Sequence, residues 1–153
     1  MATTSIQGGG NTNVMVYGSG TVVAGNGNDG INVLVNGKVT VGDGRDTINI
    51  GGNGTVVAGS GNDRIQILGN GSISVGGGHD TLTLNGAGSI TQTGTQGHDT
   101  INLGYGNDTI YVQGSATVNS GSFPAYGRGR FSSGRFTEGH GTHTGIFGRI
   151  HHH

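Results

Sequence analysis

An aspartate that follows a glycine-rich turn recurs every 17 residues along most of this chain, and this period constrains the fold more than any other feature. Six of the eight acidic residues fit the pattern Gly-x-Gly-x-Asp or a close variant. They are Asp29, Asp46, Asp63, Asp80, Asp99 and Asp108, with spacings of 17, 17, 17, 19 and 9 residues. Seventeen residues before Asp29 the same unit occurs without its carboxylate, at Thr12. A fixed period of this length indicates a stacked repeat architecture.

The alternation of apolar and polar residues within each unit predicts two short strands. Apolar residues stand two and four positions after each aspartate, as in Ile48-Asn49-Ile50, and again ten and twelve positions after each of the first three, as at Val39 and Val41. This alternation is typical of a strand with one buried face. Between the two strands an Asn-Gly pair recurs, and we expect a turn in which the glycine adopts a positive φ. The pairs begin at Asn36, Asn53 and Asn70.

Stacking of the units is required, because neither strand of a unit can bury its apolar face alone. We therefore expect an all-β fold, a parallel β-roll or β-solenoid of about six to seven coils. Like residues of successive coils should stack in columns, with a spacing of about 4.8 Å from one residue to the next. The last aspartate, Asp108, follows Asp99 by half a coil and should lie on the opposite edge of the solenoid. The expected segments are a short lead at 1–7, the solenoid at 8–120 and a tail at 121–153 rich in Gly, Arg, Phe and His.

The amino-acid composition argues against several classes of structure and function. The chain has 36 glycines among 153 residues and no cysteine, which excludes disulfides and cysteine-based metal sites. No stretch approaches the roughly 20 apolar residues of a membrane span. The formal net charge of −1 gives no electrostatic case for nucleic-acid binding. No motif fixes Ser, His and Asp in a catalytic geometry, so we do not expect an enzyme.

The aspartate column needs positive charge. Two carboxylates about 5 Å apart repel each other by roughly 3 kcal/mol at an effective dielectric constant near 20. Arg45 and Arg64 are isolated and form no neutralising column. Ca²⁺ takes six to eight oxygen ligands, including carboxylates and backbone carbonyls, and glycine lets a turn direct carbonyls at one point. We therefore expect Ca²⁺ at these turns, with Asp43 solvated and His79 and His98 exposed.

The units resemble the calcium-binding repeats of the RTX (repeats-in-toxin, hemolysin-type) proteins, Gly-Gly-x-Gly-x-Asp-x-U-x. The matches end at the six aspartates, as in Val41-Gly-Asp-Gly-Arg-Asp46 and Ala58-Gly-Ser-Gly-Asn-Asp63, and cover residues 8–120. The resemblance implies calcium between adjacent coils, at Asp29/Asp46, Asp46/Asp63, Asp63/Asp80 and Asp80/Asp99. The family usually carries calcium turns on both edges, whereas this chain has them on one edge until Asp108.

The same resemblance implies a secreted protein, exported by a bacterial type I system and folded by calcium outside the cell. Within that class we expect a structural protein that self-associates into an extracellular filament, layer or matrix. The alternatives are a calcium-dependent recognition or adhesion module, including an ice binder, and a secretion or folding module that serves an enzyme on another chain. The tail at 121–153 could be an export signal, a cap or an assembly segment.

Overall fold

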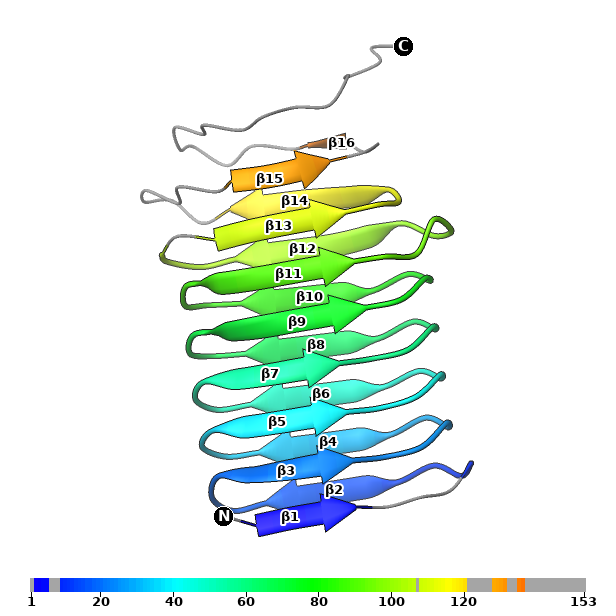
Figure 1. Cartoon of the computed structure of the whole chain (residues 1–153), viewed down its shortest axis with the longest axis vertical. Coiled ribbons are helices and arrows are strands. Elements are labelled where there is room, and N and C mark those ends of the chain that lie inside the picture. The colour runs from blue at the N-terminus through cyan, green and yellow to red at the C-terminus, as the bar shows by residue number, and fades with distance from the viewer. Residues whose placement is uncertain (1, 6–8, 107, 121–127, 132–134, 137–153) are drawn as a thin grey trace.

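The chain folds into a parallel β-solenoid of about six turns in which two sheets face each other (Figure 1). The structure is a computed structural model that describes residues 2–5, 9–106, 108–120, 128–131 and 135–136. Each sheet has eight parallel strands, and the chain alternates between the sheets from one strand to the next. The all-β solenoid expected from the repeat is confirmed, and no helix occurs in the described residues.

The odd-numbered strands form one sheet and the even-numbered strands form the other. The odd sheet contains β1 (Ala2–Ser5), β3 (Gly20–Val23), β5 (Gly37–Thr40), β7 (Gly54–Val57), β9 (Gly71–Val75), β11 (Gly88–Gln92), β13 (Asp108–Val112) and β15 (Arg128–Phe131). The even sheet contains β2 (Asn13–Val16), β4 (Gly30–Val33), β6 (Thr47–Ile50), β8 (Arg64–Ile67), β10 (Thr81–Leu84), β12 (Asp99–Leu103), β14 (Ala116–Ser120) and β16 (Arg135–Phe136). Strand β1 lies in the expected lead, and β15 and β16 lie in the expected tail.

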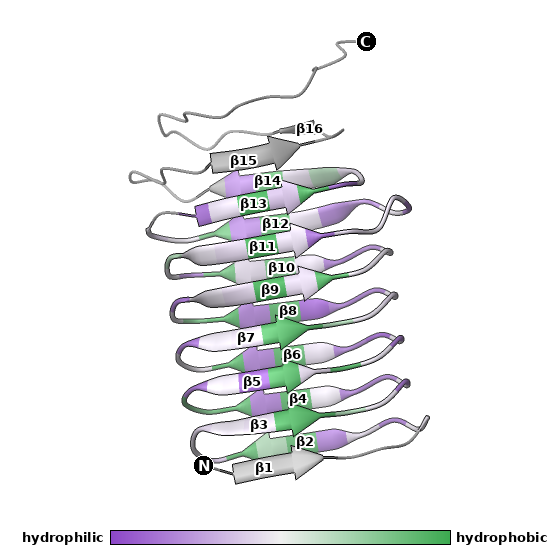
Figure 2. Ribbon diagram, in the orientation of Figure 1, coloured by the Kyte–Doolittle hydropathy of each residue, from purple (hydrophilic) through white to green (hydrophobic). Residues whose placement is uncertain are grey.

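The core is made of aliphatic columns, one residue per coil. Ile31 pairs with Ile48 in the next coil, and Ile48 pairs with Ile65, at the 17-residue spacing of the sequence. The facing column of the odd sheet runs through Val39 and Val56, and all of these side chains are at most 1% exposed. Figure 2 shows the resulting hydrophobic stripe at the same place on successive strands. The predicted inward faces of both strands are therefore confirmed.

The Asn-Gly pairs differ from the expectation. Gly37, Gly54 and Gly71 each begin a strand, and positive φ angles occur at other glycines. Glycine is needed here for space, since a Cβ at Gly71 would collide with the carbonyl oxygen of Gly54 in the preceding coil. The prediction of a positive φ at these glycines was wrong because the side chain of the preceding asparagine orders the turn through a hydrogen bond to the next coil. Asn53 Oδ1 accepts a hydrogen bond from the backbone N–H of Asn70 in the next coil, at 2.8 Å.

One coil is longer than the others. Gly88 still pairs with Gly71 at the regular spacing, whereas Thr100 pairs with Thr81 after 19 residues. The two extra residues therefore lie in the turn between β11 and β12, which projects further than its neighbours (Figure 1). Gln92, 1% exposed at a core position, fills this turn and donates a hydrogen bond from Nε2 to the carbonyl of Gly94 at 2.6 Å.

Candidate functional site

The six predicted aspartates are buried inside the turns, each at most 2% exposed. Five of them, Asp29, Asp46, Asp63, Asp80 and Asp99, stack on the edge that leads into the even strands. Asp108 begins β13 and pairs with Gly88, so it lies on the other edge, as half a coil of spacing predicts. The carboxylates face inward because each aspartate has the same parity as the two buried apolar residues that follow it.

One carboxylate oxygen of each aspartate accepts a hydrogen bond from the backbone of the preceding coil. The backbone N–H of Asp29 donates to Asp46 Oδ1 at 2.8 Å, and that of Asp46 donates to Asp63 Oδ1 at 3.0 Å. The bonds from Asp63 to Asp80 and from Asp80 to Asp99 are both 2.8 Å. Thr12 is the donor to Asp29 at the beginning of the stack, and Gly88 is the donor to Asp108 on the other edge. The contacts of the five stacked aspartates form the carboxylate ladder.

The other oxygen, Oδ2, has no hydrogen-bond partner in any of the six aspartates, and it is shielded from solvent. Buried polar atoms nearly always have a partner, and a buried charge without one is costly. The repetition of the same unsatisfied atom at one position of every turn indicates a common requirement. Protonation would remove the charge, but it would leave a buried O–H donor that also needs an acceptor. A bound cation would satisfy the oxygen directly.

The glycine two positions before each aspartate adopts a positive φ. The angles at Gly27, Gly44, Gly61, Gly78, Gly97 and Gly106 lie between 102° and 155°. A Cβ at Gly44 would collide with the carbonyl oxygen of Gly27 in the preceding coil, and a Cβ at Gly61 would collide with that of Gly44. Only glycine allows these backbones to approach so closely. In the turns of the stacked aspartates, the carbonyl of one such glycine thus lies directly against the glycine of the next coil.

Burial raises the pKa of several ladder carboxyls. The pKa of Asp63 rises to about 6 and that of Asp80 to about 7, chiefly because burial penalises the charged form, although the backbone hydrogen bond opposes the rise. Burial likewise raises the pKa of Asp46 and Asp99. At the other edge the pKa of Asp108 rises to about 6. The protein environment alone therefore does not stabilise the ionised ladder.

The donor set fits a hard cation that is shared between turns. In the described residues no three His, Asp or Glu side chains converge on one point, because each turn of the stack supplies one buried carboxylate. A cation would therefore take carboxylate oxygens from the ladder and complete its shell with backbone carbonyls, which suits Ca²⁺. The pairs implied by the sequence are adjacent coils of the ladder, from Asp29/Asp46 to Asp80/Asp99. Asp108 has no carboxylate neighbour in the described residues.

Three other turn residues, His79, His98 and Asp43, are exposed as predicted but make hydrogen bonds that were not predicted. His79 and His98 are exposed as expected, but they are ordered by each other: the N–H of His98 donates to His79 Nδ1 at 3.1 Å. Asp43 is exposed, yet its Oδ1 accepts from the N–H of Ser60 at 2.8 Å, so it is more than a solvated side chain.

Side-chain columns parallel to the ladder were missed by the sequence reasoning. Asn11 Oδ1 accepts from the N–H of Asn28, and Asn28 Oδ1 accepts from the N–H of Arg45, both at 2.8 Å. The signal available in the sequence was the recurrence of asparagine at the same 17-residue spacing.

Comparisons with protein-family models, with curated proteins and with solved structures found no match to this chain. In the described part of the chain no helix is long and apolar enough to cross a membrane.

Proposed function

We propose that this chain is a calcium-binding structural protein whose solenoid is stable when cations neutralise the carboxylate ladder. The observation that carries the proposal is the unpartnered, solvent-shielded Oδ2 of every ladder aspartate. Six buried carboxylates make the metal-free solenoid costly at neutral pH, because charged groups out of water need compensation. Bound Ca²⁺ would supply that compensation as a divalent charge with several oxygen ligands.

The residues that would hold the metal are the five stacked aspartates together with backbone carbonyls of the glycine-rich turns. The hydrogen bonds to Oδ1 fix the orientation of each carboxylate and leave Oδ2 available. Glycines such as Gly44 and Gly61 permit the close approach of successive turns. The parallel solenoid, the 17-residue spacing and the stacked aspartates are all consistent with a β-roll, and they support the resemblance to RTX repeats.

Extracellular action is part of the proposal and rests on the resemblance to RTX repeats, and the affinity typical of extracellular calcium modules is compatible with it. Extracellular calcium modules bind with dissociation constants of about 10⁻⁴ to 10⁻³ M. A chain with this affinity stays metal-free inside a cell and loads outside it, which fits export before folding. The regular sheets and the single aliphatic core suit a structural role, and strand edges offer a route to self-association into a filament, layer or matrix.

A calcium titration followed by circular dichroism tests the proposal. In calcium-free buffer at neutral pH we expect little β-sheet signal, and millimolar Ca²⁺ should restore it. Mg²⁺ should act poorly because it requires a smaller octahedral shell. A β-sheet spectrum that is the same with and without calcium at neutral pH would refute the proposal.

A further inference from the structure

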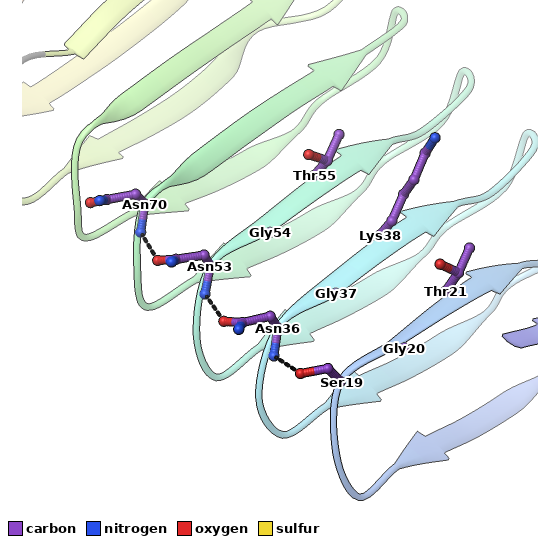
Figure 3. A pocket seen from close by; sticks show the side chains of 10 residues that line it. All are labelled: Ser19, Gly20, Thr21, Asn36, Gly37, Lys38, Asn53, Gly54, Thr55 and Asn70. Carbon is purple, nitrogen blue, oxygen red and sulfur yellow. Dashed lines mark hydrogen bonds between the residues drawn. The ribbon is translucent and has the colours of Figure 1, made fainter. Parts of the chain in front are cut away.

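A shallow groove runs along the edge of the solenoid opposite the stacked aspartates. It has a volume of about 410 Å³ and spans four coils (Figure 3). One wall is the row Ser19, Asn36, Asn53 and Asn70, and the other wall is the row Thr21, Lys38 and Thr55. Glycines at the starts of β3, β5 and β7 lie between the two rows. We refer to this site as the amide groove.

The backbone of the asparagine wall is already fully engaged in stacking. The N–H of Gly37 donates to the carbonyl of Asn53 at 3.0 Å, and the N–H of Gly54 donates to the carbonyl of Asn70 at 3.0 Å. The N–H of Asn53 donates to Asn36 Oδ1 at 2.8 Å. A ligand in the amide groove would therefore contact mainly side chains, because these backbone groups already form hydrogen bonds between coils.

The side-chain groups that remain are mainly donors. Because a backbone N–H can only donate, the atom it contacts in Asn36, Asn53 and Asn70 must be Oδ1, which fixes each amide orientation. The Nδ2 groups of these asparagines have no hydrogen-bond acceptor within the described part of the chain. They form a row of donors that repeats once per coil, about 4.8 Å apart.

A single positive charge lies on the other wall of the groove, across the glycines from this row of donors. Lys38 is exposed on β5 and pairs with Thr21 of β3 and Thr55 of β7, so hydroxyl-bearing neighbours flank it on both sides. No carboxylate forms an ion pair with Lys38 among the described residues. The groove thus offers a periodic set of donors, a few hydroxyls and one unneutralised ammonium.

We infer that the amide groove binds an extended acidic polysaccharide. Such a chain carries oxygen acceptors at regular intervals and carboxylate groups, which match the repeating amides and Lys38. A peptide strand fits less well, because it needs acceptors for its own N–H groups and the backbone acceptors of the wall are occupied. Nucleic acid fits less well because it carries a charge on every residue, and one lysine over four coils would neutralise too few of them. A polysaccharide that is charged only on alternate sugars needs fewer cationic contacts.

Binding to a hyaluronan oligosaccharide long enough to span the four coils tests the inference. The measurement is calorimetry in a buffer in which circular dichroism shows the β-sheet signal. Side-chain amide NMR signals of Asn36, Asn53 and Asn70 provide a second readout. We expect binding to hyaluronan with shifts of these three signals, and weaker binding to a neutral cello-oligosaccharide and to oligothymidylate of equal length.

Matched variants follow from the columns of the solenoid. Lys38→Thr introduces the residue that both neighbouring coils carry at this position. The substitution should weaken hyaluronan binding by about tenfold or more through loss of a charge-assisted hydrogen bond. Arg45→Asn removes the same charge on the opposite edge, where Asn28 and Asn62 occupy the column, and it should change affinity by less than about twofold.

A third variant separates the amide from the stacking contact. Asn53→Ser keeps an acceptor for the next coil, as Ser19 Oγ accepts from the N–H of Asn36 at 3.3 Å, but it removes the Nδ2 donors. Binding should weaken about fivefold while the β-sheet signal persists.

Four results would overturn the inference: no hyaluronan binding by the folded protein, equal losses in Lys38→Thr and Arg45→Asn, equal affinity for the neutral oligosaccharide, or preference for oligothymidylate. The amide groove contains none of the ladder aspartates, so these results are separate from those of the calcium titration.

Discussion

At the scale of single residues, the two oxygens of each ladder aspartate have different roles. Oδ1 orders the turn by accepting the N–H of the preceding coil, whereas Oδ2 is buried without a partner. The hydrogen bond to Oδ1 can form whether the carboxyl group is ionised or protonated at Oδ2. The second atom makes the ionised form costly, so the ladder couples folding to protons and to cations.

The pH dependence of the calcium-free protein follows from this cost. The folded-state pKa values of Asp63, Asp80 and Asp108, at about 6 to 7, lie above the ordinary value of 3.8, so the folded state holds more protons between these limits. The free energy of unfolding should therefore be highest below about pH 4 and fall as the pH rises to about 7. Circular dichroism in calcium-free buffer should show β-sheet in acid and its loss at neutral pH. Calcium should reverse this loss, since it binds the deprotonated form. A calcium-free protein that is more stable at pH 7 than at pH 4 would contradict the assignment.

Two substitutions at Asp63 separate the roles of its oxygens. Asp63→Asn keeps Oδ1 and removes the charge, so calcium-free protein should keep its β-sheet to a higher pH while calcium stabilises it less. Asp63→Ala also leaves the buried N–H of Asp46 without its acceptor, which should cost about 1–3 kcal/mol at every pH. Urea denaturation with and without calcium measures both effects. The control is Asp43→Asn, at an exposed acceptor, which should change stability by less than about 0.5 kcal/mol. Identical behaviour of Asp63→Asn and Asp63→Ala would show that the Oδ1 acceptor of Asp63 has no separate role.

At the scale of the elements, Gln92 shows how a coil accommodates two extra residues. It occupies the core column between Val75 and Val112, where every coil of regular length has an apolar side chain. Its Oε1 accepts from the N–H of Gly114 at 3.1 Å, and its Nε2 donates to the carbonyl of Gly94. A buried amide replaces an apolar side chain here because it pairs with backbone groups of two turns, the longer turn at Gly94 and the turn after β13 at Gly114.

Gln92→Val should therefore destabilise the protein by about 1–3 kcal/mol, although valine restores the column, because it removes hydrogen bonds inside the core. Deleting Thr95 and Gln96 returns the coil to 17 residues, and in that shortened protein the same substitution should cost less. A double-mutant cycle by urea denaturation, with calcium held constant, measures the coupling between the two changes. Additive effects would mean that Gln92 does not act on the longer turn.

The sequence was sufficient for the strands of the repeat, because a 17-residue period with period-two alternation allows one register, and the nine-residue step from Asp99 was sufficient for the placement of Asp108. It was insufficient for β1, β15 and β16, which lie outside the repeat, and for the roles of the turn residues. The Asn-Gly pairs predicted a turn with a positive φ at the glycine, but stacking replaced that local solution with a side chain that accepts from the next coil. The inward direction of the aspartates could have been deduced from parity with Ile48 and Ile50. Their hydrogen bonds could not, since these depend on how closely successive turns approach.

At the scale of the whole molecule, the sheets end at strands that have a partner on one side only among the described residues. Strand β2 is the last strand of the even sheet at one end, and Met15 on it is 50% exposed. An open strand edge can pair with another chain, and lysine at such an edge suppresses pairing. Self-association through strand edges is part of the proposed function.

Met15→Lys should therefore reduce self-association of the calcium-loaded protein. The matched control is Asn32→Lys, which places the same charge in the same column on β4, a strand with neighbours on both sides. Light scattering over a wide concentration range should show large assemblies for the wild type and for Asn32→Lys, and smaller ones for Met15→Lys. A wild-type protein that remains monomeric in calcium at all concentrations would argue against assembly.

The carboxylate ladder also gives the solenoid a direction. Every coil receives its acceptor from the coil that follows it, from Thr12, which donates to Asp29, to Asp80, which donates to Asp99. Asp99 itself donates to the carbonyl of Ser115, so the series stops where the carboxylates stop. Removing coils from the N-terminal side would expose an acceptor to water, which costs little. Removing them from the C-terminal side would expose a backbone N–H to water instead, so a shortened stack would present an acceptor at its beginning and a donor at its end.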